Sequence, residues 1–190
     1  VFNKKYRTFV TEGNYNNHIG LPLSILEINY DHELAVLEFG ANHTGEHELL
    51  CRIAKPTHGL ITNIGKDHLE GYGGYEGVVK AHKEFTDYMH ANDRLFFYNA
   101  DDENLQELAK DLASVSFGAG SYNNGKLDCA GSINRQFPSL SVNIEQSILN
   151  YNEAYTIDTQ LYGRYNFYNV MAAACLAEYF KVPVRKIQEG

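Results

Sequence analysis

The sequence predicts an α/β fold, a three-layer, doubly wound arrangement in which a mostly parallel sheet carries helices on both faces. Between residues 7 and 118, short apolar stretches alternate regularly with stretches of helical period. One apolar stretch, residues 34–39, is nearly continuous, as in strands that are covered on both faces. Residues 126–161 contain short alternating segments instead, which predict antiparallel strands and hairpins at one edge of the sheet.

In the first half of the chain, the predicted helices begin at residues that favour helix N-termini. Pro22 fits the first turn of one helix, and Thr44 opens the next. In the first of these helices we expect Leu23 and Leu26 to face the interior. The expected strands are residues 7–10, 34–39 and 59–61, and the expected helices are residues 22–28, 44–54 and 75–90.

The second half of the chain continues the alternation and then ends in a long helix. Two strands are expected at residues 94–98 and 115–118, with a helix at 102–112 between them. Helical period returns at residues 166–180. The apolar residues spaced for a buried face of this last helix are Val170, Ala173, Ala174, Ala177 and Phe180.

Length, composition and charge limit the class of protein. A chain of 190 residues with 44% hydrophobic residues can form one large domain with a full core, which we expect to be monomeric. A net charge of −8 without a Lys/Arg run argues against a nucleic-acid surface. No apolar run approaches the length of a membrane span. Three widely spaced cysteines, with Cys51 and Cys175 in apolar helical patterns, indicate buried thiols and a cytoplasmic location.

The loop at residues 62–73 is the most informative stretch. It follows the apolar run 59–61, which places it at the carboxyl end of a parallel strand, where open α/β sheets bind their ligands. Asp67, His68 and Glu70 supply the donors of a divalent-metal or phosphate-transfer site, with Asp67 able to orient His68. The alternative is a solvated polar turn.

Two acidic residues flank another loop. Glu38 stands near the end of an apolar strand, where an unpaired buried carboxylate would be unfavourable, so metal binding is one interpretation. The other is that this acid caps the helix that follows. For Glu46, at the start of that helix, we favour capping, since carboxylates stabilise helix N-termini.

The helix at residues 75–90 carries a further candidate, His82. It shares a face with three apolar residues and so should point toward the sheet and its ligand edge, although a single histidine on such a face is often a core residue. Lys83 lies about 100° around the same helix. The three apolar residues are Val78, Phe85 and Met89.

Two segments are rich in asparagine and glycine. Residues 163–169 combine a glycine turn, Arg164 and two asparagines, Asn166 and Asn169, at a helix start, a pattern able to bind a nucleotide base or phosphate. Asn166 could instead be the N-cap, whereas Asn169 is less easily explained by capping. Residues 13–20 could form an ordinary turn, but their place between a strand and a helix puts them at the same sheet edge.

Together these segments resemble the central ATPase domain of the Mur ligases, and within that family they are most similar to the members that add D-Ala-D-Ala. Five motifs occur in the family's order with about its spacing and cover nearly the whole chain. They are Thr-x-Gly-Asn-x-Asn-Asn-x-Ile-Gly-x-Pro (residues 11–22), Glu-x-Gly-Ala-Asn-x-x-Gly-Glu (38–46), Thr-Asn-Ile-Gly-x-x-His-Leu-Glu-Gly-x-Gly (62–73), Asn-Ala-Asp-Asp (99–102) and Gly-Arg-x-Asn-x-x-Asn (163–169).

The resemblance implies an amide ligase that uses ATP and Mg²⁺. Its substrates would be UDP-MurNAc-tripeptide and D-Ala-D-Ala. ATP would phosphorylate the terminal carboxylate of the tripeptide, and the amine would attack the resulting acyl phosphate, releasing ADP and phosphate. Metal, amides and cations would neutralise the charge of the transferring phosphoryl group.

The same resemblance assigns roles to individual residues. Glu38 and His68 would be ligands of Mg²⁺. Asn169, with Asn166, would contact the adenine. On the nucleotide side the matching residues are Asn166, Asn169, Arg164 and Asn99. The loop residues that would face the muramoyl-peptide and the phosphates are Thr11, Asn14, Asn16 and Asn17.

The chain departs from the family's pattern in two respects. The phosphate loop Gly-x-x-Gly-Lys-Thr/Ser is expected upstream of Val1, so we expect residues 1–190 to be a piece of a longer protein that lacks the N-terminal UDP-binding and the C-terminal domains. Such a piece should be inactive and bind ATP weakly. The family also carries a lysine, often carbamylated, after the His loop. A gapless match places His82 there, and a shift of one residue presents Lys83.

Three other functions fit parts of the pattern. Folylpolyglutamate synthase shares the architecture, although the asparagine-rich loop favours the D-Ala-D-Ala-adding enzymes. A metal-dependent hydrolase could use Glu38, His68 and His82, and should then bind Zn²⁺ tightly without nucleotide. A non-catalytic module could bind the UDP-peptide or a protein partner.

Overall fold

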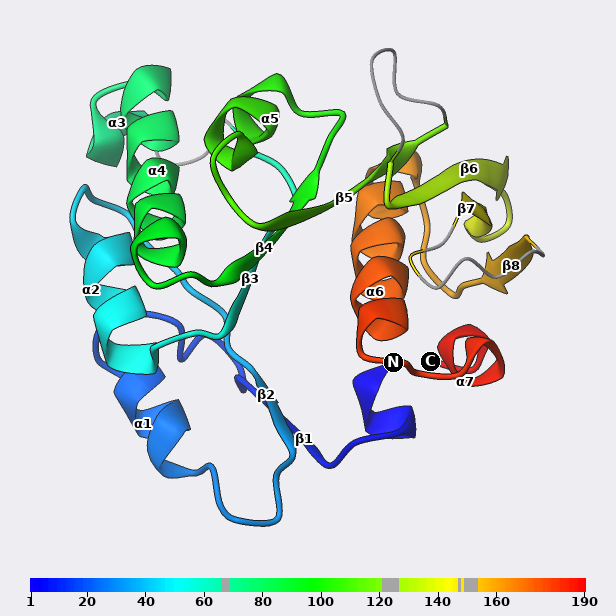
Figure 1. Cartoon of the computed structure of the whole chain (residues 1–190), viewed down its shortest axis with the longest axis horizontal. Coiled ribbons are helices and arrows are strands. Elements are labelled where there is room, and N and C mark those ends of the chain that lie inside the picture. The colour runs from blue at the N-terminus through cyan, green and yellow to red at the C-terminus, as the bar shows by residue number, and fades with distance from the viewer. Residues whose placement is uncertain (66–68, 121–126, 147, 149–153) are drawn as a thin grey trace.

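Two β-sheets form the framework of the chain in the computed structural model, which describes residues 1–65, 69–120, 127–146, 148 and 154–190. The larger sheet has six strands in the order β3-β4-β5-β6-β7-β8, and the smaller pairs β1 with β2 (Figure 1). The strands are β1 (Thr8–Val10), β2 (Leu34–Val36), β3 (His58–Ile61), β4 (Leu95–Asn99), β5 (Ser114–Ala119), β6 (Cys129–Arg135), β7 (Ser141–Gln146) and β8 (Tyr155–Asp158).

The pairing confirms the mostly parallel sheet with an antiparallel edge. Strands β3, β4, β5 and β6 run parallel, and β7 and β8 continue the same sheet in antiparallel fashion. The predicted antiparallel region therefore begins with one strand, β6, that still pairs in parallel with its neighbour β5. Hairpin connections suffice for β6–β7–β8, whereas each parallel pair needs a longer crossover.

Helices cover both faces of the larger sheet because its side chains alternate. Phe96 and Phe97 are adjacent in β4, fully buried, and belong to different cores. Phe96 packs with α4 and α5, and Phe97 packs with α6. The helices are α1 (Gly20–Leu26), α2 (Glu46–Ala54), α3 (Leu69–Tyr72), α4 (Tyr75–Ala91), α5 (Glu103–Ala109), α6 (Phe167–Tyr179) and α7 (Val184–Gln188), with 3₁₀ turns η1 (Phe2–Lys4) and η2 (Arg164–Asn166).

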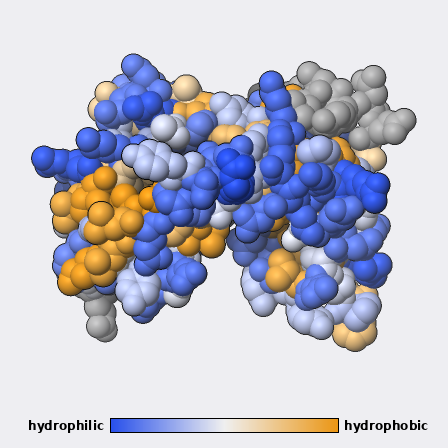
Figure 2. All heavy atoms as spheres, turned by 90° about the horizontal axis from the view of Figure 1, so that it is seen from below, coloured by the Kyte–Doolittle hydropathy of each residue, from blue (hydrophilic) through white to orange (hydrophobic). Residues whose placement is uncertain are grey.

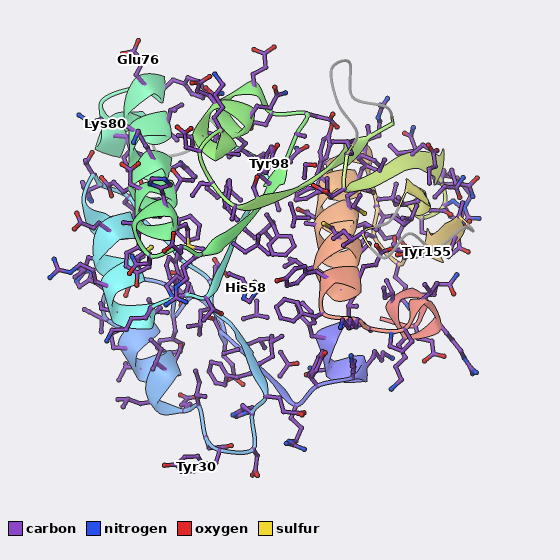
Figure 3. All side chains as sticks on the ribbon, in the orientation of Figure 1. Tyr30, His58, Glu76, Lys80, Tyr98 and Tyr155 are labelled. Atoms are coloured by element: carbon purple, nitrogen blue, oxygen red, sulfur yellow. The ribbon has the colours of Figure 1, made fainter. Side chains whose placement is uncertain are left out.

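Helix α6 is buried almost all round because it lies against four strands of the sheet. It also buries a carboxylate: Glu178 is fully buried and accepts hydrogen bonds from the Tyr155 hydroxyl (2.6 Å) and the Ile148 N–H (3.1 Å). At the C-terminus of α6, the ring of Phe180 contacts the ring of His58, which is labelled in Figure 3. No helix among the described residues is both long and apolar enough to cross a lipid bilayer.

The β1–β2 sheet has an open edge. Strand β2 pairs with β1 on one side only, and no ladder joins it to β3 in the described part of the chain. Val36 is 43% exposed. The prediction that residues 34–39 form a strand covered on both faces is therefore wrong: the strand spans only Leu34–Val36, and none of its residues is buried.

Helix α1 also differs from its prediction. It begins at Gly20, and Leu23 and Leu26 are 48% and 80% exposed, so the predicted inward face points to solvent. The buried face of the helix includes Gly20 instead. This residue packs so closely that a Cβ on it would lie 2.5 Å from the Cα of Tyr15. Exposed apolar side chains account for the orange area over this half of the molecule in Figure 2.

One polar side chain is buried where α2 packs on α4. His47 is 9% exposed, and its ring centroid lies 5.2 Å from that of His82. Burial, reinforced by His82, lowers the pKa of His47 to about 4, because a charged imidazole would lose its hydration there. The histidine is therefore neutral at physiological pH. The thiols of Cys51 and Cys175 are buried and free, as predicted.

Truncation of the central strand tests the core. We expect Phe97→Ala to lower the free energy of unfolding by about 3–5 kcal/mol, because it leaves a cavity between the sheet and α6. Urea denaturation gives this quantity. The control Leu26→Ala, at an exposed position, should change stability by less than about 0.5 kcal/mol. Equal effects of the two substitutions would contradict the packing described.

Burial of His47 predicts a dependence of stability on pH. Its pKa falls from 6.5 when exposed to about 4 when folded, so below pH 6.5 the unfolded chain binds a proton that the folded chain does not. Stability contributed by the neutral histidine is thus present above pH 6.5 and is lost toward pH 4, by up to about 3 kcal/mol. In His47→Leu this part of the pH dependence should disappear, as measured by urea midpoints at pH 7 and 5. An identical pH dependence in both proteins would refute it.

Candidate functional site

A cleft of about 760 Å³ separates the two sheets. One wall is the edge formed by residues 34–39, and the other is formed by residues 57–63 around β3. Helices α2 and α4 reach it through His47 and His82, and the end of α6 reaches it through Phe180. The carboxyl ends of both strands therefore meet here, as expected for a ligand site in a parallel α/β fold. The polar side chains at these ends are Glu38, Thr62 and Asn63.

The asparagine-rich loop after β1 holds Glu38. The Asn16 amide donates a 2.8 Å hydrogen bond to the Glu38 carboxylate, and the Thr11 hydroxyl accepts one from the Glu38 N–H (3.0 Å). The chain after Glu38 passes so close that a Cβ on Gly40 would lie 2.6 Å from the Asn16 side chain. Two motifs separated by more than twenty residues thus form one unit, which fixes one carboxylate oxygen and leaves the side chain exposed.

The remaining residues of this loop have different roles. The side-chain oxygen of Asn17 accepts hydrogen bonds from the N–H groups of Ile19 (3.0 Å) and Gly20 (2.9 Å). These bonds stabilise the start of α1. The Asn14 side chain is exposed, and its backbone carbonyl accepts from the Asn16 N–H (2.8 Å). Of the four predicted substrate residues, Asn14 leaves its side chain most open to a ligand.

The structure brings His82, and not Lys83, to the cleft. His82 lines the cavity with Glu38, and its Nδ1 lies 2.9 Å from the Val78 carbonyl oxygen. A carbonyl can only accept, so Nδ1 carries the proton and Nε2 has a free lone pair. Lys83 instead forms an exposed ion pair with Asp87, one turn further along α4. The predicted helical phase thus decides between the two neighbouring residues.

Two carboxylates accept hydrogen bonds from the backbone N–H groups that immediately precede α2. Glu46 accepts hydrogen bonds from the N–H groups of Asn42 (2.6 Å) and His43 (3.1 Å), and those bonds, that to Asn42 foremost, lower its pKa. Glu46 is the first residue of α2, as predicted, but its carboxylate bonds N–H groups of the preceding loop and none of the helix, so the predicted capping of the helix is wrong. Glu84 of α4 accepts from the Gly45 N–H (2.6 Å) and so ties α4 to the same helix start.

The turn at residues 99–102 joins the carboxyl ends of three strands. Asp102 caps α5 and also accepts from the Ile64 N–H (2.9 Å) after β3. Asp101 accepts from the Ala119 N–H (2.7 Å) at the end of β5. Asn99, 3% exposed, accepts from the Asp101 N–H (3.0 Å). In this structure Asn99 therefore shapes the turn, and the acids beside it position the neighbouring loops.

The asparagine pair at the start of α6 forms its own hydrogen-bond unit. Asn166 donates to the Tyr162 carbonyl (2.8 Å), and its carbonyl oxygen accepts from the Asn169 amide (3.1 Å). Asn166 stands at the N-cap position without a side-chain capping bond, so the capping interpretation is wrong. Asn169 and Arg164 are exposed. Arg164 lines a second, open depression that also includes Gly120 at the end of β5.

Contacts connect the asparagine pair to the rest of the carboxyl edge. Tyr168, between the two asparagines, lies beside Asp101, and burial together with that carboxylate raises the pKa of Tyr168. Because Asp101 also holds the end of β5, the pair is anchored to the same edge as the turn after β4. The loop after β3 joins this edge through Asp102.

The site offers oxygen donors for Mg²⁺ but no complete set of protein ligands. Among the residues that the structure describes, no three His, Cys, Asp or Glu side chains are arranged to hold a metal ion. His68, with Asp67, lies outside the described residues. Mg²⁺ usually retains water and binds through one or two carboxylates plus substrate phosphates, so the exposed carboxylate of Glu38 fits that need.

Two residues of the candidate site, His47 and Asp101, were missed or only partly recognised by the sequence interpretation. His47 lies in the cleft wall, and its spacing with Leu50, Cys51 and Ala54 places it on the inward face of α2, a signal present in the sequence. Asp101 was matched only as part of a motif. Its contact with α6 depends on a helix more than sixty residues away and leaves no local signal.

Comparison with known proteins gives consistent results. The family model for the Mur ligase middle domain matches residues 1–177 of this chain. The chain is 32% identical over its full length to the UDP-N-acetylmuramoyl-tripeptide–D-alanyl-D-alanine ligase of Bacillus subtilis, of which it spans 39%. Over 90% of the chain it is 29% identical to the corresponding Escherichia coli ligase, of which it spans 37%.

Solved structures show the same fold. MurF from Acinetobacter baumannii superposes with a TM-score of 0.79 at 27% identity, covering 99% of this chain and 40% of that one. MurF ligase from Thermotoga maritima, solved in complex with ADP, gives a TM-score of 0.81 at 24% identity, covering 100% and 43%. With a family match over nearly all of its length, the chain belongs to the Mur ligase middle-domain family.

Proposed function

We propose that this chain is the central ATP-binding part of an ADP-forming ligase that joins D-Ala-D-Ala to UDP-MurNAc-tripeptide. The relatives of that name are more than twice as long, so the activity would belong to a longer, cytoplasmic and monomeric enzyme, with residues 1–190 alone inactive. The observation that supports the proposal most directly is the cleft. Glu38, His82 and the carboxyl end of β3 share it, in a chain that matches the family model.

Glu38 is the best-placed residue for the magnesium nucleotide. Asn16 and Thr11 fix its orientation, and the exposed carboxylate can approach a cation at the cleft mouth. Mg²⁺ bound there would neutralise charge on the phosphates of ATP during phosphoryl transfer. The role of the protein is to hold that carboxylate in one position, so that little reorganisation is needed in the transition state.

The asparagine pair would bind the base. An adenine presents both donors and acceptors, and a side-chain amide can satisfy both. Asn166 already fixes Asn169 through a 3.1 Å hydrogen bond, which leaves Asn169 exposed and oriented. Arg164 is exposed nearby and can contact phosphate or ribose. Asn14 is exposed in the loop whose Asn16 holds Glu38, which leaves its side chain available to the peptide substrate.

We further propose that one additional parallel strand enters the cleft between β2 and β3. Each of these strands has an edge that lines the cleft and pairs with no other strand of the described residues, and each already runs parallel to its one neighbour. A strand inserted there would join the two sheets into one. It would also cover part of the exposed surface of Val36. A phosphate loop at its carboxyl end would then lie next to Glu38.

Substitutions at two ends of the site test the ligase assignment. In the full-length enzyme, Glu38→Gln should reduce kcat for ADP-forming addition of D-Ala-D-Ala by about 10²-fold or more, since it removes a carboxylate ligand of the metal. Asn169→Ala should raise the KM for ATP about tenfold with a smaller change in kcat, because one base contact is lost. A coupled assay of ADP release measures both.

Lys83→Ala provides the matched control. The residue lies next to His82 but points to Asp87, so kcat and KM should stay within about twofold. Loss of activity in this control with retention in Glu38→Gln would overturn the assignment. A hydrolase would instead release product with Zn²⁺ and without nucleotide.

Hydrogen exchange tests the inserted strand separately. In the 190-residue chain the edge amides of β3 facing the cleft should exchange rapidly, because they lack a partner. In the full-length enzyme they should be protected by about 10²-fold or more. The amides of β4, paired on both sides, serve as the internal reference. Equal exchange at β3 in both proteins would contradict the insertion.

A further inference from the structure

The cleft wall contains a pair of histidines whose free nitrogens have no assigned partner. His47 from α2 and His82 from α4 both line the cleft, with ring centroids 5.2 Å apart and ring planes at 41°. His47 is more than nine-tenths buried, and its Nδ1 is completely buried without a hydrogen-bond partner. A buried polar atom in this state requires an explanation, since such groups are nearly always satisfied.

The hydrogen bonds of the two rings determine where their protons are. The Nδ1 of His82 donates to the Val78 carbonyl, which leaves Nε2 as a lone pair. The ring of His47 is neutral, because burial lowers its pKa to about 4, and its Nδ1 has no hydrogen-bond partner. A neutral imidazole has one unprotonated nitrogen, and an Nδ1 without an acceptor is suited to be that nitrogen. A backbone carbonyl of α4 thus fixes the ring of His82, and each ring has one unprotonated nitrogen to offer.

We propose that His47 and His82 form a two-imidazole site for a borderline divalent cation, of the class of Zn²⁺ or Co²⁺, in the wall of the cleft. Neutral imidazole nitrogens prefer such ions, whereas Mg²⁺ prefers oxygen ligands. A backbone carbonyl that holds the opposite ring nitrogen, as that of Val78 does for His82, is a usual outer partner of a metal-binding histidine. Water or oxygens of a bound ligand would complete the coordination, because no third protein ligand is arranged there among the described residues.

The separation of the rings agrees with a shared ion. For a metal–nitrogen distance of about 2.1 Å, each ring centroid lies about 3.2 Å from the ion, so two ligands at about 110° have centroids about 5.2 Å apart. The observed centroid distance is 5.2 Å. The two rings can therefore bind one ion with little movement. The histidines share the cleft with Glu38 but are different side chains, and binding of the cation does not depend on the proposed ligase activity.

Metal titration of the 190-residue chain tests the site directly. Calorimetry with ZnCl₂ should show one high-affinity equivalent, and Co²⁺ should give visible d–d absorption that Zn²⁺ abolishes and excess Mg²⁺ does not. His47→Gln and His82→Gln should each weaken Zn²⁺ binding by about tenfold or more. Glutamine keeps polarity and approximate size, and circular dichroism with urea midpoints establishes that each variant is folded.

Two variants serve as matched controls. His90→Gln removes an exposed histidine from the same helix as His82, and Cys51→Ser removes a buried thiol one turn from His47 on α2. Both should bind Zn²⁺ within about twofold of the parent chain. Nitrogen-15 spectra of the imidazoles give a second readout: Zn²⁺ should shift Nδ1 of His47 and Nε2 of His82.

The proposal is overturned if the parent chain binds no Zn²⁺ at submillimolar concentration, which would leave water as the partner of the buried nitrogen. It is also overturned if both glutamine variants bind Zn²⁺ as the parent does, or if the zinc-shifted nitrogens belong to other histidines. None of these results would bear on the ligase assignment, which depends on Glu38 and Asn169.

Discussion

The carboxyl edge of both sheets is organised by side-chain oxygens that accept backbone N–H groups. Thr11 accepts from the Glu38 N–H, Asp102 accepts from the loop after β3, and Asp101 accepts from the end of β5. Loop N–H groups that lack ladder partners must be satisfied, and short side chains from neighbouring loops do so. The hydrogen bonds that satisfy the loop N–H groups therefore also fix the distances between the loops. These distances set the geometry of the site.

The cleft between β2 and β3 is the second constraint. Neither edge pairs with a further strand in the part of the chain that the structure describes, and apolar residues such as Val36 and Leu60 remain partly exposed beside them. An exposed edge of this kind is normally covered or paired in a complete protein. The position of the cleft explains why Glu38, placed at the end of an apolar strand, is not a buried charge: its strand lies at the open boundary of the described structure.

Helix α4 links the two kinds of chemistry in the cleft. Its 3.6-residue period presents His82 to the cleft and turns Lys83 to solvent, where Asp87 binds it. The Val78 carbonyl of the same helix also holds the ring of His82. Two helices thus position the imidazole nitrogens, whereas a hydrogen-bonded loop holds the carboxylate oxygen, and the preferences of nitrogen and oxygen ligands separate the cations each could bind.

The alternation of strands and helices, the parallel sheet with its antiparallel edge, the phase of α4 and the family resemblance could all be predicted from the sequence. These follow from local periodicity and from motif spacing, which are properties of short segments. Three outcomes could be read only from the folded structure. They are the buried face of α1, the lack of a capping bond from Asn166 to α6, and the contact between the rings of His47 and His82. Those outcomes depend on contacts between segments far apart in the chain, such as Tyr15 against Gly20 and α2 against α4, and no local pattern encodes the partner.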